Sequence, residues 1–184
     1  SIMSSFTRNE IKRSFIKLLE TKKYSNITVR DIVDDCRINR GTFYYHFQDI
    51  PSLLEEIAHD VIDELIAQNP DIHDSLECFD AIVSLLKDNK RRIMHIYHSL
   101  NRETFEKEAI RLCRHFITLY ISDYLPSDKY DSETRESYIR YSTAFMLGFM
   151  IMWLDSELSD EEAEKFRKTI DIMQAGIKSL KDLA

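Results

Sequence analysis

The sequence predicts an all-α protein with a small three-helix head at its N-terminus and a larger helical bundle behind it. Apolar residues recur at helical spacing along most of the chain, and no sustained alternation of apolar and polar residues marks a β-strand. Only 3 glycines and 3 prolines interrupt the 184 residues, and 43% hydrophobic residues are enough for a packed core. No apolar run approaches the length of a bilayer span and no segment resembles a signal peptide. We therefore expect a soluble, cytoplasmic protein without membrane contact.

The head begins with a helix predicted over residues 7–22. Its apolar stripe includes Ile11, Phe15 and Leu19, and Thr7 with Glu10 three residues later fits a capping box. This stripe is expected to support the two short helices that follow.

Two short helices joined by a tight turn are predicted over residues 28–47, which is a helix-turn-helix arrangement. Thr28 stands where an N-cap hydroxyl belongs, ahead of a helix whose apolar face includes Ile32 and Val33. A break at residues 37–39 follows. Residues 40–47 form the second helix, which in such motifs enters the major groove of DNA.

The second helix has the residue types that read DNA. With Ile38, Phe43 and Phe47 facing inward, the polar residues between them stay near the surface. Arginine pairs with guanine, asparagine with adenine, and threonine reaches a base edge or a thymine methyl, whereas tyrosine and histidine donate to phosphates. These candidates are Asn39, Arg40, Thr42, Tyr44 and His46, while Tyr45 has burial at the helix junction as an open alternative.

Residues 28–47, read together with Gln48, Asp49 and Leu53, resemble the helix-turn-helix signature of the TetR (tetracycline-repressor) family of transcriptional regulators. The segments ITVRDIV and GTFYYHF carry the resemblance, in order and spacing. It implies an all-helical homodimer that binds a double-stranded DNA operator through its head and a small-molecule effector through its C-terminal domain. Transferred position by position, it implies DNA contacts by Thr28, Arg40, Thr42, Tyr44, Tyr45 and His46.

Two residues depart from the family pattern. Arg37 stands where glycine is usual at the end of the first motif helix, a position that often needs a left-handed backbone, which is costly for arginine. Its side chain is also a candidate phosphate contact. Ile50 stands where a phosphate-binding lysine is common, which predicts weaker DNA binding or a greater part for Gln48.

Charge is divided unequally along the chain. Residues 1–48 contain nine basic and five acidic residues, a net charge of +4, so the remaining residues carry −11 of the total of −7. A basic head on an acidic body is expected where only the head meets phosphate, the alternative being an ordinary solvated face. We therefore expect a DNA-binding domain over residues 1–48 and an effector-binding and dimerisation domain over residues 49–184.

The body is predicted to consist of helices over residues 50–68, 74–87, 90–100, 102–124, 133–154 and 160–181. Asp49 is a suitable cap for the first of these and Pro51 fits its first turn. This helix is the only long element predicted to join the head to the body.

The last two helices are predicted to form the dimer interface, as a four-helix bundle across a two-fold axis. Residues 138–154 are apolar over an arc broader than one intramolecular face needs, and the glycine within it permits close approach of another helix. The alternative is a fully buried core helix in a monomer. The predicted interface residues are Tyr141, Phe145, Gly148, Phe149, Met152, Phe166, Ile170, Met173 and Ile177.

Soft and aromatic side chains in the body predict an effector pocket, with core filling as the alternative. The predicted pocket residues are Met94, Tyr97, Cys113, Phe116, Tyr120, Phe145, Phe149 and Trp153. His95 and His98 share one helical face, but no cluster of cysteines or carboxylates accompanies them, so we expect no metal and no cofactor. The three widely spaced cysteines predict reduced thiols.

The sequence contains no enzyme motif, since it lacks a glycine-rich phosphate loop, a nucleophile elbow and a zinc-protease pair. The predicted function is a repressor that an effector releases from a palindromic operator. Residues 86–106 and 148–162 resemble a TetR branch that includes regulators of dihydroxyacetone kinase genes, some of which act as coactivators with a partner regulator protein. A coactivator is therefore one alternative. A helical ligand-binding or catalytic protein without DNA recognition is another, which the basic head disfavours.

Overall fold

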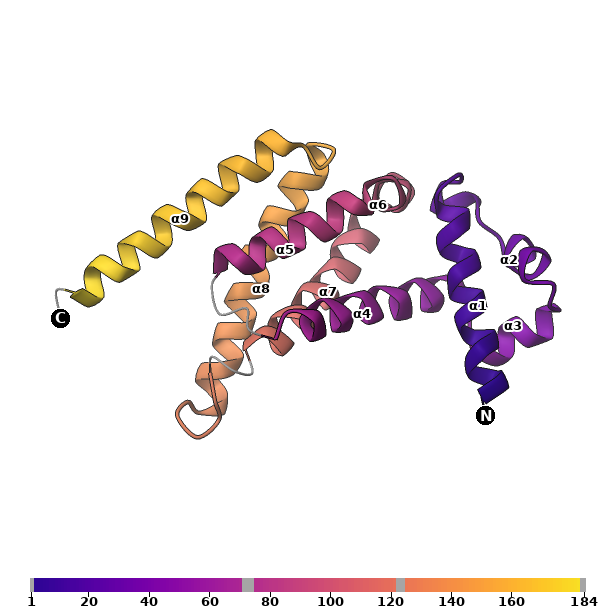
Figure 1. Ribbon diagram of the computed structural model, residues 1–184, viewed down its shortest axis with the longest axis horizontal. Helices are drawn as coiled ribbons and strands as arrows, with labels where there is room; N and C mark the ends of the chain where they lie inside the picture. The colour runs from indigo at the N-terminus through magenta and orange to yellow at the C-terminus, as the bar shows by residue number, and fades with distance from the viewer. Residues whose placement is uncertain (1, 71–74, 122–124, 183–184) are drawn as a thin grey trace. The chain divides into compact units, whose positions relative to one another are not determined.

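The computed structural model describes residues 2–70, 75–121 and 125–182, with side chains at residues 3–70, 76–121 and 125–176. Over these ranges the chain is mainly helical and contains no β-strand, so the all-α prediction is confirmed. The elements shown in Figure 1 are α1 (Ile2–Leu19), the 3₁₀ turn η1 (Tyr24–Asn26), α2 (Val29–Cys36), α3 (Arg40–His46), α4 (Ile50–Gln68), α5 (Ser75–Asp88), α6 (Lys90–Tyr97), α7 (Arg102–Ile121), α8 (Ser132–Asp155) and α9 (Asp160–Asp182).

The predicted helix bounds agree with these to within a few residues, except at the start of α1. The predicted helix ends at Asp74 and Tyr124 lie outside the described residues. The capping box predicted at Thr7 is wrong, because α1 already begins at Ile2 and the Thr7 hydroxyl donates to the Met3 carbonyl at 3.0 Å. A threonine inside a helix satisfies its hydroxyl in this way, so the sequence pattern does not mark a helix start.

The chain divides into two compact units, Ser1–Glu64 with Arg91–Glu108 and Leu65–Lys90 with Ala109–Ala184. The division falls inside α4 and inside α7. Helix α6, apart from its first residue Lys90, belongs to the first unit although it follows α5 in the chain. The domain boundary predicted after residue 48 stays a prediction.

The first unit has a core that joins α1, α2, α3 and the start of α4. Ile11, Phe15 and Leu19 lie four residues apart on the inner side of α1, and all are buried. They pack with buried residues of the helix-turn-helix and its flanks, namely Ile27, Ile32, Val33, Phe43, Phe47 and Leu53. This core holds the two motif helices against α1, as the apolar spacing predicts.

Helix α6 is fastened to the end of α1 within the first unit. The His95 Nδ1 atom lies 2.6 Å from the Leu19 carbonyl oxygen, and Arg92 pairs with Glu20 at 2.7 Å. The side chain of Ile96 packs against the core of the head. His95 is thus used for an interhelical contact.

Aromatic side chains form the centre of the second unit. The Phe149 ring of α8 stacks on Phe166 of α9 with ring centroids 3.9 Å apart, and its centroid lies 5.2 Å from that of Phe79 in α5. Arg167 of α9 donates to both carboxylate oxygens of Asp80 on α5, at 2.9 and 3.1 Å. These contacts hold α9 beside α5 (Figure 1).

Helices α8 and α9 meet at a tight, well-packed corner. Trp153 is fully buried there, and its indole N–H donates to the Ser159 carbonyl at 2.9 Å. Glu157 and Leu158 have φ angles of 58° and 53°. Leu158 is nevertheless buried, so its packing compensates for a left-handed backbone that glycine adopts more readily.

Candidate nucleic-acid interface and C-terminal groove

Thr28 begins the helix-turn-helix by capping α2, as predicted. Its hydroxyl accepts a hydrogen bond from the Asp31 N–H at 3.2 Å, and the Asp31 carboxylate accepts one from the Thr28 N–H at 2.8 Å. This capping box satisfies two of the N–H groups that the start of a helix leaves unpaired. The bonds from Thr28, with the Lys22 ammonium, lower the pKa of Asp31 to about 2. Thr28 is exposed, but its hydroxyl is already engaged in the cap.

The turn between α2 and α3 is closed by Arg37 in a left-handed conformation, with φ 56° and ψ 42°. The Arg37 N–H bonds the Asp34 carbonyl at 3.4 Å and the Ile38 N–H bonds the Val33 carbonyl at 3.0 Å, which are the paired bonds of a Schellman motif. The left-handed backbone predicted at this position is therefore confirmed. The Arg37 side chain is exposed.

Asn39 caps α3 and shapes its first turn. Its Oδ1 accepts hydrogen bonds from the Thr42 N–H at 2.8 Å and from the Thr42 hydroxyl at 3.2 Å. Gly41 leaves room for this cap, because a Cβ there would lie 3.1 Å from the same oxygen. Asn39 is exposed and Thr42 half-buried, and both contribute to holding the N-terminus of α3.

Helix α3 has a buried side and an exposed side. Phe43 is fully buried, whereas Arg40 and Tyr44 are exposed. Tyr45 is 77% exposed, so the alternative that it fills the helix junction is wrong. The exposed side therefore presents one arginine and two phenols. The ring of Tyr44 also packs edge-on against the buried Phe43, with centroids 5.4 Å apart.

His46, the last residue of α3, is half-buried. Burial, and then repulsion by the Arg8 guanidinium, lower its pKa below the ordinary 6.5. The imidazole is therefore neutral at pH 7, and its ring N–H is a hydrogen-bond donor without a positive charge.

Ion pairs neutralise most basic residues of the head. Six of the nine basic residues in 1–48 pair with carboxylates: Arg8, Lys12, Arg13, Lys17, Lys22 and Arg30. In the part of the chain that the structure describes, Lys23, Arg37 and Arg40 form no ion pair. Arg37 and Arg40 flank the turn before α3, so uncompensated positive charge is concentrated at the start of that helix.

The second unit contains an open groove of about 680 Å³ between α5, α7, α8 and α9. Its described lining is mostly apolar and includes no charged side chain, and its polar groups come from tyrosines and from Thr134, Ser137, Ser142 and Gln174. A smaller hollow of about 190 Å³, walled by the end of α4 with α5 and α7, shares Cys78, Phe116 and Tyr120 with it.

The predicted pocket residues divide into two groups. Those lining the groove are Phe116, Tyr120, Phe145 and Phe149. Met94 and Tyr97 belong to α6 of the first unit, whereas Cys113 and Trp153 are buried without lining the groove. The prediction missed the hydroxyl residues of α8, whose interruption of the apolar arc was the available signal.

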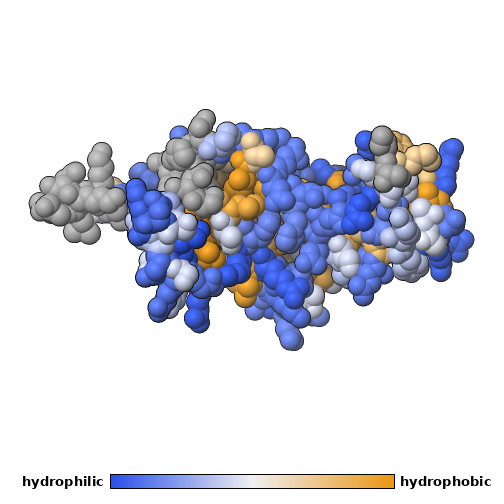
Figure 2. Space-filling model, turned by 90° about the horizontal axis from the view of Figure 1, so that it is seen from below, coloured by the Kyte–Doolittle hydropathy of each residue, from blue (hydrophilic) through white to orange (hydrophobic). Residues whose placement is uncertain are grey.

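The predicted interface residues also divide. An exposed stripe on α8, here called the α8 stripe, consists of Tyr141, Phe145, Gly148 and Met152 at alternating four- and three-residue spacing. A Cβ added at Gly148 would meet no atom within 4 Å. Hydrophobic side chains reach the surface among hydrophilic ones in Figure 2. Of the remaining predicted residues, Met173 is exposed, Phe166 half-buried, Phe149 and Ile170 buried, and the side chain of Ile177 lies outside the described residues.

The described residues show no candidate metal site. No group of three or more potential metal-ligating side chains gathers there, and the cysteines are free. Burial raises the pKa of Cys78 and of Cys113 to about 12, so both thiols are protonated at neutral pH.

Among the described helices, none combines the length and apolarity needed to cross a membrane.

Comparison with protein-family models gives two matches. The model of bacterial regulatory proteins of the tetR family matches residues 16–57, and the model of a transcriptional regulator C-terminal region matches residues 73–175. The second match alone spans more than half of the chain.

Two curated relatives are similar in sequence. The uncharacterised helix-turn-helix transcriptional regulator YxbF of Bacillus subtilis is 29% identical over an alignment of 155 residues that covers 81% of this chain and 40% of that protein. The dhaKLM operon transcriptional activator DhaS of Lactococcus lactis is 36% identical over 70 residues, which are 38% of this chain and 37% of that protein. The chain thus spans about two fifths of the length of the relatives it matches.

Two solved structures share the fold. The dihydroxyacetone kinase operon activator DhaS has a TM-score of 0.63 at 24% identity, covering 97% of this chain and 98% of that one. A TetR transcriptional regulator from Streptococcus agalactiae has a TM-score of 0.56 at 22% identity, covering 91% and 94%. At these identities the similarity shows the fold alone.

Proposed function

The chain belongs to the TetR family of bacterial transcriptional regulators, and from that premise we propose that it binds operator DNA as a homodimer through α3 and represses transcription until an effector binds its C-terminal unit. Members of this family are DNA-binding transcription factors and not enzymes. A regulator of bacterial genes works where the DNA lies, so we place the protein in the cytoplasm.

The observation that carries the proposal is the uncompensated charge beside an exposed α3 face. Arg37 and Arg40 form no ion pair in the described part of the chain, while six other basic residues of the head are neutralised. Leaving two guanidiniums free where the motif meets a DNA groove supports contact with phosphates and bases.

We assign roles to the exposed residues by their chemistry. Arg40 and Thr42 read base edges, since arginine pairs bidentately with guanine and threonine reaches a thymine methyl. Tyr44, Tyr45 and neutral His46 donate to phosphates, and Arg37 adds a charged phosphate contact. Thr28 and Asn39 contribute at the N-termini of α2 and α3, where their caps hold the helices that approach the DNA.

The homodimer places two copies of α3 on one operator. The α8 stripe supports a subunit interface on α8, because its four exposed residues at helical spacing form one apolar surface and Gly148 leaves room for a second helix. Two recognition helices read half-sites about 34–36 Å apart, which predicts a roughly palindromic operator.

The groove of the second unit supports an uncharged, largely apolar effector with a few hydrogen-bonding groups, because its described lining offers hydroxyls and an amide but no charge. Tyr141 and Phe145 belong to both the groove and the α8 stripe. An effector there would alter packing next to the proposed interface. It changes DNA affinity only if it binds the two conformations of the dimer with different affinity.

The test of DNA reading compares Arg40→Ala with Tyr44→Phe in gel-shift titrations. The operator is first obtained by sequencing the genomic fragments that the purified protein retains. We expect Arg40→Ala to lose sequence preference and Tyr44→Phe to weaken binding about equally on all duplexes. If both variants bind operator and random duplex as the wild type does, the assigned roles are wrong.

The sign of regulation needs a separate measurement, since one relative, DhaS, is named as an activator. A promoter fused to a reporter should be more active after deletion of the gene if the protein is a repressor. Lower activity after deletion, with DNA retained only in the presence of a second regulator protein, would instead establish the coactivator alternative.

A further inference from the structure

Arg8 of α1 contacts both α3 and α4. None of the residues proposed to read DNA links these two helices. Its Nε donates to Glu56 Oε1 of α4 at 2.8 Å, and its Nη2 pairs with Glu56 Oε2. Its Nη1 donates to the backbone carbonyl of His46, the last residue of α3, at 2.7 Å. The guanidinium carbon also lies 4.4 Å from the ring centroid of Phe47. One side chain therefore contacts the end of α3 and the side of α4 at once.

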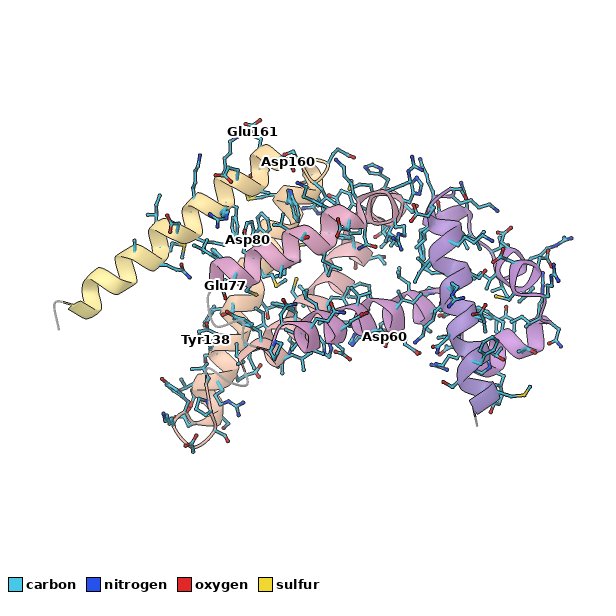
Figure 3. The ribbon with its side chains drawn as sticks, in the orientation of Figure 1. Asp60, Glu77, Asp80, Tyr138, Asp160 and Glu161 are labelled. Carbon is cyan, nitrogen blue, oxygen red and sulfur yellow. The ribbon has the colours of Figure 1, made fainter. Side chains whose placement is uncertain are left out.

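Glu56 is held firmly enough to serve as an anchor. The two-pronged contact with Arg8 is the geometry in which arginine binds a carboxylate most strongly. Lys12, one turn further along α1, lies 2.6 Å from Glu56 and 2.6 Å from Asp60 of α4, which Figure 3 labels. The two positive charges of Arg8 and Lys12 are therefore balanced by the two negative charges of Glu56 and Asp60.

The His46 carbonyl, at the C-terminal end of α3, is a favourable acceptor for the Arg8 guanidinium. The last carbonyls of a helix have no partner within the helix, and a cation there is favoured by the helix dipole. Helix α3 is only 7 residues long, and so short a helix does not hold its conformation alone. Asn39 fixes its first turn and Phe43 its buried side, whereas Arg8 holds its last carbonyl.

We propose that Arg8 is a positioning residue for DNA recognition, which ties the C-terminal end of α3 to α4 through Glu56 so that a displacement of α4 is passed to the recognition helix. The proposal rests on the proposed function, in that α3 is taken as the helix that reads DNA. Arg8 acts here through His46 and Glu56 and not through a phosphate, because the Glu56 carboxylate already compensates its charge.

The test uses Arg8→Met, which keeps an apolar stem over Phe47 but removes every hydrogen bond and the charge. The matched control is Arg13→Met on the same helix, because Arg13 is 80% exposed and its one ion pair among the described residues is with Glu10 of α1. Specific DNA affinity is measured at several salt concentrations for both. We expect Arg8→Met to bind about tenfold more weakly with an unchanged salt slope, since losing charge-assisted hydrogen bonds costs at least that much. We expect Arg13→Met to bind as the wild type does.

A direct phosphate contact predicts a different result. Losing one such contact lowers the slope of log affinity against log salt by about 0.9. A slope reduced by that amount in Arg8→Met would overturn the positioning role, as would an unchanged affinity in a variant that folds normally. The double variant Arg8→Met/Glu56→Met should bind no more weakly than Arg8→Met alone, because both changes break one link. Additive losses would overturn the proposed route through Glu56.

A readout without DNA separates this inference from the proposed function. The Phe47 N–H closes the last turn of α3 by donating to the Phe43 carbonyl at 2.9 Å. We expect its hydrogen exchange to be about tenfold faster in Arg8→Met than in the wild type and in Arg13→Met, with α1 amides unchanged. If the wild type retains no genomic DNA but this exchange difference is seen, the proposed function fails and the link from Arg8 to α3 stands. Equal exchange in all three proteins would overturn the link itself.

Discussion

Replacing Arg37 with glycine should make the head more stable and its DNA binding weaker. A non-glycine residue in the left-handed region, such as Arg37 at φ 56°, is strained by roughly 1–2 kcal/mol. Glycine offsets part of that gain, by about 0.4–1 kcal/mol, because it makes the unfolded chain more disordered. The expected net gain in unfolding free energy is about 0.5–1 kcal/mol, which raises Tm by about 1–4 °C. No native ion pair of the described residues is lost, since Arg37 has none there.

The same substitution removes a proposed phosphate contact. Arg37→Gly should lower the salt slope of DNA affinity by about 0.9 and weaken binding without changing sequence preference. Fluorescence anisotropy with labelled operator at four salt concentrations measures this slope, and thermal unfolding followed by circular dichroism measures Tm.

Arg37→Ala is the control, because it removes the same charge but keeps a Cβ in the left-handed region. Arg37→Gly should therefore be more stable than Arg37→Ala, and both should show the same reduced salt slope. If glycine is no more stable than alanine, the argument from backbone strain is refuted. If both variants keep the wild-type slope, Arg37 does not contact a phosphate.

Three further changes test other contacts. Asn39→Ala removes the cap of α3 and should lower the free energy of unfolding by about 1 kcal/mol, seen as a lower Tm, whereas Asn39→Asp should keep most of the stability. An alanine variant as stable as the wild type would contradict this role of the cap. Gly148→Leu should shift a dimer toward monomer in sedimentation experiments. It should not destabilise the subunit, because a Cβ at this position meets no atom within 4 Å. An unaltered dimer would place Gly148 outside the interface. Hydrogen bonding from Arg8 lowers the pKa of Glu56 from 4.5 to about 2. The ionised Glu56 carboxylate therefore stabilises the folded state fully above about pH 4.5, and this stabilisation is lost as pH falls toward 2. The difference in unfolding free energy between wild type and Glu56→Gln should therefore shrink across that window in urea titrations, and a constant difference would argue against the ion pair.

Local signals explain why the helix-turn-helix was predictable in detail. The Thr28 cap and the left-handed turn at Arg37 depend on residues within five positions of each other, so the sequence pattern contains them. The Asn39 cap is equally local, but the sequence prediction gave Asn39 only as a DNA contact and missed it. The start of α1 failed for the opposite reason. Thr7 suits a helix start and a helix interior equally, and nothing nearby distinguishes the two.

The sequence by itself determined the helical class, the family and the motif that we propose reads DNA, because periodicity, capping and turn chemistry act over a few residues. Only the tertiary structure decided which charges remain available and which apolar residues of α8 face outward. Arg8 and Glu56 neutralise each other across 48 positions of sequence. Phe145 and Phe149 lie four residues apart on one helix. Phe149 is buried against Phe79 of α5 and Phe166 of α9, whereas Phe145, whose ring centroid lies 5.4 Å from that of Phe166, stays 48% exposed. Such outcomes depend on distances through space, which the linear pattern does not contain.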